Sequence, residues 1–434
     1  MSDHSTVTIE PEDVNIPAGS KLRTLAPVVC AVIGIAGLAL SFVLKDGAGA
    51  DYTHVSKNVN ADNTVFGMSY ITSYMFWLSI ALGGLLFVLI HHATRAGWSV
   101  VVRRIAENFM CALPVVAILA APILLYSHDI FEWTHADVVA KDEMLQQKQF
   151  YLNEGFFTAR MVMYLVIWSL LTWFMYKQSV KQDETGDESH SHRARRWSPV
   201  GIIVFGITIT TAAMDYMMSL DPHWFSTIFG VYYFAGTFMA IFCAVTLAAM
   251  LLQQQGFLKT VITTEHYHDL GKYIFAFMVF WSYIAFSQYM LIWYANVPEE
   301  TYWYAYRWLT TDTGASWQLL CWALIIAHFA VPFLLLMSRH VKRRKATLAA
   351  GAIWMLVCHY LDMYFLVQPS LDFTVLAHGD PSAIHGLHFS LLDLTTFLGI
   401  GGVVMAVFFW RLGAKPLIPV RDPRLEESLA FENF

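Results

Sequence analysis

The chain has 434 residues, of which 57% are hydrophobic and only 14% charged, and its formal net charge is −6. Soluble proteins carry about 25% charged residues, so this composition excludes an ordinary soluble protein and indicates an integral membrane protein. The five cysteines lie in apolar stretches and form no CxxC pair, which argues against a cysteine-held iron–sulfur cluster or zinc site. The first 24 residues are polar and acidic and show no signal-peptide core.

Ten apolar runs are each long enough to cross a hydrocarbon layer of about 30 Å. The predicted spans are 25–44, 67–90, 109–127, 156–176, 199–220, 224–252, 272–296, 315–338, 347–367 and 386–410. Most of the 27 Lys and Arg residues fall in the termini and in the loops that follow even-numbered spans. This asymmetry predicts that both termini face the cytoplasm, which requires an even number of spans.

The connection between the fifth and sixth spans is predicted to be very short. Asp221 and Pro222 have the pattern of a helix N-cap followed by proline at the first helical position. The sixth helix is therefore expected to start at once, which makes the two helices antiparallel neighbours. We interpret Asp221 as a cap rather than as a functional group.

Three longer connections are predicted to lie at the membrane surfaces. Segment 177–196 is acidic and then basic, so we expect a mobile cytoplasmic loop in which His190 and His192 are solvated rather than metal-bound. On the outer side, 128–155 is long enough for a surface helix. Segment 298–313 mixes Tyr and Trp with charge, as is typical of a segment at headgroup level, although a docking surface for an external partner gives the same pattern.

Arg160 and Asp215 lie on consecutive antiparallel spans and are expected to form an ion pair. At 1.5 Å per residue, Arg160 lies about 6 Å and Asp215 about 8 Å below the outer surface. Such a pair either neutralises the two charges and locks the helices together or belongs to an ion pathway.

Further titratable side chains are predicted in the outer half of the membrane. His359 and Asp362 are three residues apart on the ninth span and so share a helix face. Asp393 on the tenth span is expected about 10 Å deep. The other members of this set are His128, Asp129, Glu132, His385 and His388. Together they favour a water-accessible proton path over purely structural polarity.

The inner half of the membrane has fewer candidates for proton transfer. They are His91, His92, Glu107, His328, Tyr283, Ser287, Gln288 and Tyr289. His328 and His359 lie near mid-membrane on consecutive spans, which is also the arrangement that a b-type haem needs. A second histidine pair cannot be assembled, so buried histidines with satisfied hydrogen bonds are the preferred interpretation.

Three strings carry a resemblance to a known family: FWLSIALGGLLFVLIHHATRAGW (76–98), LDPHWFSTIFGVYYFAGTF (220–238) and WSYIAFSQYMLIWYANVPEETYWY (281–304). The chain resembles, over essentially its whole length, the F subunit of alternative complex III, which belongs with the polysulfide-reductase (NrfD-like) membrane subunits. The resemblance implies an all-α integral membrane protein with two four-helix bundles, spans 2–5 and 6–9, flanked by spans 1 and 10.

The resemblance also divides the chain into regions. These are a cytoplasmic N-terminal tail (1–24), the first span with an outer loop (25–66), the first bundle (67–220), the second bundle (221–367), an outer loop with the tenth span (368–410) and a cytoplasmic C-terminal tail (411–434).

The family complex implied by the resemblance oxidises quinol in the bacterial inner membrane and passes electrons to cytochrome c or a terminal oxidase. Iron–sulfur clusters and c-type haems are expected in partner subunits, and quinol is expected at the sister C subunit. This chain is expected to be non-catalytic, to hold no cofactor and to contact lipid but no nucleic acid. It is also expected to conduct protons by a route through Arg160, Asp215, His359, Asp362 and Asp393.

Two alternatives remain open for the function: a stand-alone secondary transporter and a b-type cytochrome. Transporter helices are often broken at matching positions of two repeats. Pro114 and Pro122 interrupt the third span, but the corresponding seventh span contains no proline. This mismatch weakens the transporter alternative.

Overall fold

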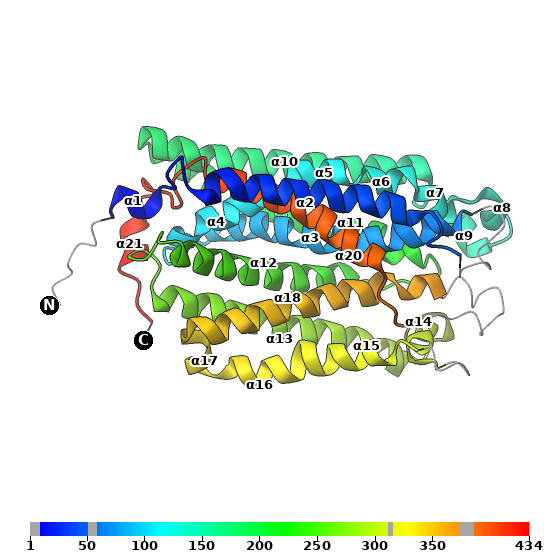
Figure 1. Cartoon of the computed structure of the whole chain (residues 1–434). Helices are drawn as coiled ribbons and strands as arrows, with labels where there is room; N and C mark the ends of the chain where they lie inside the picture. The colour runs from blue at the N-terminus through cyan, green and yellow to red at the C-terminus, as the bar shows by residue number, and fades with distance from the viewer. Residues whose placement is uncertain (1–8, 51–58, 311–315, 373–385, 434) are drawn as a thin grey trace.

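The computed structural model describes residues 9–50, 59–310, 316–372 and 386–433. These residues are mostly helical and form no strand beyond an isolated bridge between Thr310 and Ser316. Ten helical segments are long and apolar enough to cross a membrane, which confirms the prediction of an all-α, ten-span protein. The long helices run side by side along one common direction (Figure 1).

The spans are single helices, except for the third and the eighth, which are each built from three consecutive pieces. The single helices are α2 (Lys21–Lys45), α3 (Ala61–Ala93), α10 (Glu154–Thr185), α11 (Ser189–Tyr216), α12 (Phe229–Gln254), α13 (Thr264–Ala295), α18 (Lys345–Val367) and α20 (Leu391–Leu412). The third span comprises α4 (Val100–Met110), α5 (Leu113–Leu119) and α6 (Ala121–Leu125), and the eighth comprises α15 (Gln318–Ala323), the π-helical η3 (Leu324–Ala330) and α16 (Val331–Met337). Pro114 and Pro122 begin new pieces because proline cannot continue the preceding hydrogen-bond ladder.

Short helices cover the two ends of the bundle. They are α1 (Pro11–Val14), α7 (Ser127–Ile130), η1 (Glu132–Thr134), α8 (Ala136–Val139), α9 (Glu143–Lys148), η2 (Met218–Leu220), α14 (Pro298–Trp308), α17 (Arg339–Arg343) and α21 (Leu425–Leu429). The end that carries α1, α17 and α21, called here the terminal end, lies across the bundle from α8, α9 and α14, called the opposite end (Figure 1). The first and last described helices therefore lie at the same end, as an even number of spans requires.

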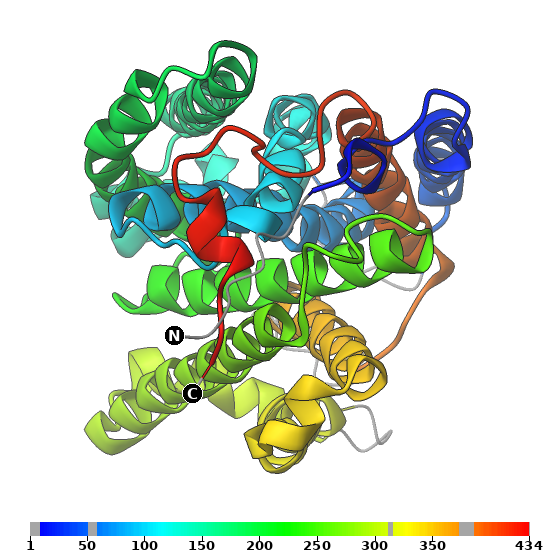
Figure 2. The ribbon, with the colours of Figure 1, turned by 90° about the vertical axis from the view of Figure 1, so that its left-hand side faces the viewer.

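Helices α3 and α12 form the centre of the molecule. Most of their side chains are buried, and the two helices pack against each other. Helix α3 also contacts α4, α11 and α20, while α12 contacts α11, α13 and α18, and the view from the terminal end shows the other helices around them (Figure 2). The division into two four-helix bundles stays a prediction.

Helix α2 lies at the edge of the molecule and is held mainly by α20. A Cβ atom on Gly34 would lie 2.6 Å from the backbone nitrogen of Val403, and one on Gly402 would lie 2.4 Å from the backbone nitrogen of Gly34. Only glycine permits this approach of the two backbones, which is a common way of joining helices in a membrane. The other faces of α2 expose large apolar side chains, as expected of a lipid-facing helix.

The connection between α11 and α12 is longer than predicted. Helix α12 begins at Phe229, so Asp221 is not its N-cap and the predicted start at Pro222 is wrong. Instead, Asp221 accepts a hydrogen bond from the Tyr302 hydroxyl of α14 at 2.6 Å, and the Trp224 ring stacks on a tryptophan of α14. These contacts with α14 provide a physical reason for the extended connection. Helices α11 and α12 nevertheless pack together, as predicted.

Three other connections also differ from the predictions. Segment 177–196 is almost entirely helical, because α10 continues to Thr185 and α11 starts at Ser189, and His190 is buried where its ring donates to Gln178 Oε1. Segment 128–155 forms several short helices rather than one. Within 298–313, residues 298–308 form α14, which directs Trp303, Tyr306 and Arg307 into the protein, and residues 311–313 lie outside the described residues.

Candidate functional site

Arg160 and Asp215 form the ion pair that the sequence predicts. Arg160 Nε lies 2.9 Å from Asp215 Oδ2, and Arg160 Nη2 lies 2.8 Å from Oδ1. The Tyr164 hydroxyl donates to Oδ2 at 2.7 Å, and Arg160 Nη1 donates to the Tyr151 carbonyl at 2.8 Å. Both charged side chains are buried, and their polar atoms have partners. The pair therefore joins α10 to α11 as a satisfied unit.

Asp362 of α18 is another buried carboxylate within the spans, and its surroundings are different from those of Asp215. The Tyr232 hydroxyl of α12 donates to Oδ1 at 2.5 Å, and Trp281 Nε1 of α13 donates to Oδ2 at 2.9 Å. Asp362 is fully buried. Within the described residues no basic side chain forms an ion pair with it. Asp362 is thus held by neutral donors from two other spans, whereas Asp215 is neutralised by a guanidinium.

The two mid-membrane histidines of the sequence, His359 and His328, are both buried, and His359 lies on the same helix as Asp362, as predicted. His359 lies one helical turn away on α18, and its Nε2 is 2.9 Å from Ser79 Oγ of α3. His328 lies in the π-helical segment η3, with its ring centroid 3.7 Å from that of Trp281, and neither ring nitrogen has a partner among the described residues. Trp281 therefore contacts both Asp362 and His328, while His359 turns towards α3.

A large apolar cavity lies beside the Asp362 site, between α13, α14 and α15. Its volume is about 800 Å³, and its wall includes Tyr232 and Trp281, the two donors to Asp362. Tyr289, a predicted polar residue of the seventh span, also lines this cavity and packs edge-on against Tyr304 at 5.1 Å. The cavity cannot be predicted from the sequence, because the apolar residues that line it have the same pattern as lipid-facing ones.

Asp393 occupies a different position from the one predicted. Helix α20 begins at Leu391, so Asp393 lies in its first turn rather than well inside the span. Its Oδ2 accepts hydrogen bonds from the backbone nitrogen of Ser390 at 2.9 Å and from the Ser390 hydroxyl at 3.0 Å, which is a capping box. Gln368 donates to the other oxygen at 3.4 Å. A helix-capping role accounts for this carboxylate.

The predicted outer set does not form one connected cluster in the described part of the chain. Asp215, Asp362 and Asp393 each have their own partners, and no hydrogen bond joins any two of these carboxylates there. The remaining members that the structure describes lie at the opposite end. His128 lies beside His135, Asp129 accepts from the backbone of Asn60, the ring of His388 bonds to the Gly386 carbonyl, Glu132 lies in η1, and His385 is outside the described residues.

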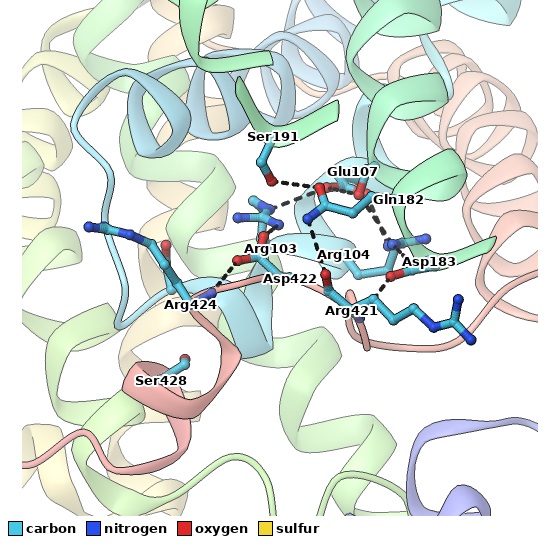
Figure 3. A network of polar contacts seen from close by, with 12 residues as sticks. Arg103, Arg104, Glu107, Gln182, Asp183, Ser191, Arg421, Asp422, Arg424 and Ser428 are labelled. Atoms are coloured by element: carbon cyan, nitrogen blue, oxygen red, sulfur yellow. Dashed lines mark hydrogen bonds and ion pairs between the residues drawn. The ribbon is translucent and has the colours of Figure 1, made fainter. Parts of the chain in front are cut away.

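A buried cluster joins three segments at the terminal end, and Glu107 of the predicted inner set is its one member that was a candidate in the sequence (Figure 3). This terminal-end ionic cluster consists of Arg103, Arg104, Glu107, Asp183 and Asp422. Glu107 lies 3.4 Å from Arg103 Nε and 3.0 Å from Arg104 Nε. Arg104 Nη2 donates to Asp183 Oδ2 at 2.5 Å, and Arg103 pairs with Asp422 of the segment 413–433 after α20, called here the C-terminal segment. The cluster thereby ties α4, α10 and the C-terminal segment together.

The signal for this cluster was present in the sequence. Arg103 and Arg104 precede Glu107 by four and three residues, a spacing that places opposite charges on one helix face. The predicted third span begins at residue 109, so both arginines fall in the loop before it and indicate only the orientation of the chain. Burial alone would raise the pKa of Asp422, but the charge and hydrogen bond of Arg103 outweigh it and hold that pKa below its usual range. Asp422 is therefore charged at neutral pH.

Arg307 of α14 is a second buried charge that was not singled out. Its Nη1 donates to the Trp303 carbonyl at 2.8 Å and to the Tyr306 hydroxyl, and its guanidinium lies 3.3 Å from the centroid of the Trp303 ring. An aromatic cage thus holds a cation at the opposite end of the bundle. The nearby Asp221 is also buried, and this burial raises its pKa.

His91 of the predicted inner set lies at the end of α3, where its Nδ1 donates to the Phe87 carbonyl at 2.6 Å. In the described parts of the chain, no group of three or more His, Cys, Asp and Glu side chains is arranged to hold a metal ion. Comparison with protein-family models and with curated protein sequences found no match for the chain.

Proposed function

We propose that this chain is a cofactor-free integral subunit of a quinol-oxidising respiratory complex of the alternative complex III type, and that Asp362 is its internal proton-exchanging group. In this proposal the iron–sulfur clusters and c-type haems belong to partner subunits. The sister C subunit handles quinol, and cytochrome c or a terminal oxidase accepts the electrons. This chain provides protonatable groups within the membrane.

The packing of the family-like segments supports this proposal. The strings 220–238 and 281–304 contact each other at several points. Ser226 donates to Gln288 at 2.8 Å, and Trp224 stacks on Trp303 with 4.4 Å between the ring centroids. The same two strings contribute Tyr232 and Trp281, the donors to Asp362. The residues that carry the resemblance therefore surround the candidate group.

The surroundings of Asp362 are the observation that carries the proton-transfer role. A buried carboxylate is costly inside a membrane and commonly marks a functional position. Among the described residues, neutral donors rather than a cation hold Asp362. The carboxylate is therefore not fixed in its ionised state by an opposite charge. A tyrosine hydroxyl 2.5 Å away and two nearby histidines are groups that can pass or receive a proton. Arg160 and Asp215, in contrast, serve in this proposal as a helix lock.

The proposal places the chain in the bacterial inner membrane with the terminal end at the cytoplasm. Lys and Arg gather in segments at that end, including the sequence RHVKR of α17 and the arginines of α4 and of the C-terminal segment. Positive charge of this kind favours the cytoplasmic side. Asp362 and the Arg160–Asp215 pair then lie toward the periplasmic half.

The test is isolation of the full chain, affinity-tagged, from its native membrane in mild detergent. We expect c-type cytochromes and an iron–sulfur subunit to co-purify in a fixed ratio and the preparation to oxidise quinol. A tagged, unrelated multi-pass protein from the same membrane serves as the control. If the chain is recovered alone, without haem c and without quinol oxidation, the proposal is rejected in favour of a stand-alone transporter.

A further inference from the structure

A small polar cavity opens at the terminal end, between the end of α3, the start of α11 and the C-terminal segment. Its volume is about 80 Å³. That is room for a few water molecules or one small oxyanion. Its lining residues are His91, His92, Arg95, Ala96, Arg103, Ser191, His192, Arg195, Asp422, Pro423 and Arg424. Seven of these side chains are arginine or histidine, whereas Asp422 is the single acidic one.

The basic residues of this cavity are not all neutralised by the protein. Arg103 at its floor is paired with Asp422 and Glu107. The side chain of Arg424 lies 3.8 Å from Glu427, at the limit of an ion pair. Among the described residues, neither Arg95 nor Arg195 makes an ion pair, and both are exposed at the mouth. The cavity therefore has two guanidinium groups that no carboxylate of the described chain engages.

Buried polar groups at the floor also point to a ligand. Arg103 and His92 are each at least nine-tenths buried. His92 Nε2 is inaccessible to solvent and has no hydrogen-bond partner among the described residues. A buried polar atom without a partner is costly, and a bound oxyanion or the water around it would satisfy this one.

We propose that this cavity binds a phosphate group, carried either by an anionic phospholipid or by free phosphate. Arginine is suited to phosphate because its planar fork donates two parallel hydrogen bonds. The cavity lies where α11 passes from the charged sequence HRARR into its apolar part, which is the depth of lipid headgroups. Basic pockets between membrane helices at this level bind anionic headgroups. The inference does not depend on the respiratory role.

The test compares two double variants of the full chain in detergent. Arg95→Gln with Arg195→Gln removes the two unpaired guanidinium groups of the cavity. Arg193→Gln with Arg196→Gln removes the same charge from exposed positions of α11 that do not line the cavity. Inorganic phosphate is titrated into delipidated protein by calorimetry. Phospholipid retained after reconstitution with phosphatidylcholine and phosphatidylglycerol is identified by native mass spectrometry.

We expect the cavity variant to lose phosphate affinity by about tenfold or more, or to lose retained phosphatidylglycerol, while the control variant behaves as the parent chain. Loss in the calorimetric arm identifies free phosphate as a ligand, and loss in the lipid arm identifies the headgroup. Arg195→Glu alone, which reverses one charge, should act in the same direction. Equal phosphate binding and equal lipid retention in all variants would overturn the proposal.

Discussion

Arg160 donates from two nitrogens to the two carboxylate oxygens of Asp215, across distances of 2.9 and 2.8 Å, and so joins α10 to α11 inside the apolar bundle. Tyr164 completes the site by donating to the same carboxylate at 2.7 Å. Such a pair stabilises the fold only when both partners are present, because removing one of them leaves a buried charge without compensation.

We therefore expect Asp215→Asn to destabilise the chain by about 3–5 kcal/mol, because Arg160 would remain charged and buried. Replacing both residues by apolar ones, Arg160→Met with Asp215→Leu, should restore most of the lost stability. Thermal unfolding of the purified chain in detergent measures both effects. An Asp215→Asn chain that unfolds like the parent would show that the pair does not lock the helices.

The contact between α2 and α20 gives a second expectation. Gly402→Leu should weaken this contact, because even a Cβ atom there would lie 2.4 Å from the backbone nitrogen of Gly34. We expect a loss of about 3 kcal/mol or more, together with easier proteolysis near α2. Gly206→Leu is the matched control, since a Cβ atom at Gly206 has open space around it. Equal stability of the two variants would contradict the proposed role of the glycines.

The C-terminal segment is anchored by Asp422, and its anchoring should depend on pH. The pKa of Asp422 is lower in the folded chain than its ordinary value of about 3.9, so the ion pair with Arg103 stabilises the fold at every pH above that value. This stabilisation is lost as the pH falls through the lowered folded pKa. The protection factors of the amides near residue 422, which are corrected for the pH dependence of intrinsic exchange, should therefore be constant from pH 8 to about 5 and fall only below about 4.

Asp422→Asn provides the control for this pH dependence. The variant should show low protection factors near residue 422 at every pH, because Arg103 loses one of its two charged partners and the segment loses about 3 kcal/mol of stabilisation. Protection of these amides in the variant equal to that in the parent chain would show that other contacts hold the segment.

The geometry of the two core histidines leads to a spectroscopic expectation. His359 Nε2 is 2.9 Å from Ser79 Oγ, and a Cβ atom on Gly236 would lie 2.7 Å from His359 Cε1. His328 packs against Trp281 instead. A b-type haem needs both imidazoles as axial ligands with the macrocycle between them. We therefore expect the isolated chain to show no Soret band, and a reduced b-type spectrum would contradict this assignment of the histidines.

The sequence was sufficient to predict the spans, because length and hydrophobicity decide which segments cross a bilayer. It was also sufficient for the Arg160–Asp215 pair, since both residues lie near the same end of adjacent spans. The sequence was not sufficient to predict the structural roles of Asp221 and Asp393, because the local sequence around each of them is compatible with several structures. The contact of Asp221 with α14 is distant in the sequence, and the helix boundary at Leu391 changed Asp393 from an interior carboxylate to a capping one.

The terminal-end ionic cluster was missed for a related reason. The spacing of Arg103, Arg104 and Glu107 indicates a charged helix face, but the partners Asp183 and Asp422 lie far along the chain. The two arginines precede the predicted third span, and a position in a predicted loop gives no indication that a charged side chain is buried. Hydrophobic periodicity also fails to identify the core-facing side of a helix in a membrane protein, because lipid-facing and core-facing positions are both apolar.

The central claim is that Asp362 exchanges protons within a quinol-oxidising complex, and its most direct test is the number of protons released per quinol by the isolated complex in closed vesicles. Asp221→Asn is the matched control, because Asp221 also accepts a hydrogen bond from a tyrosine but lies outside the spans. We expect Asp362→Asn to slow turnover by about tenfold or more and to lower proton release, with unchanged subunit content and a normal Asp221→Asn complex. Proton release and turnover equal to those of the parent complex in Asp362→Asn would contradict the claim.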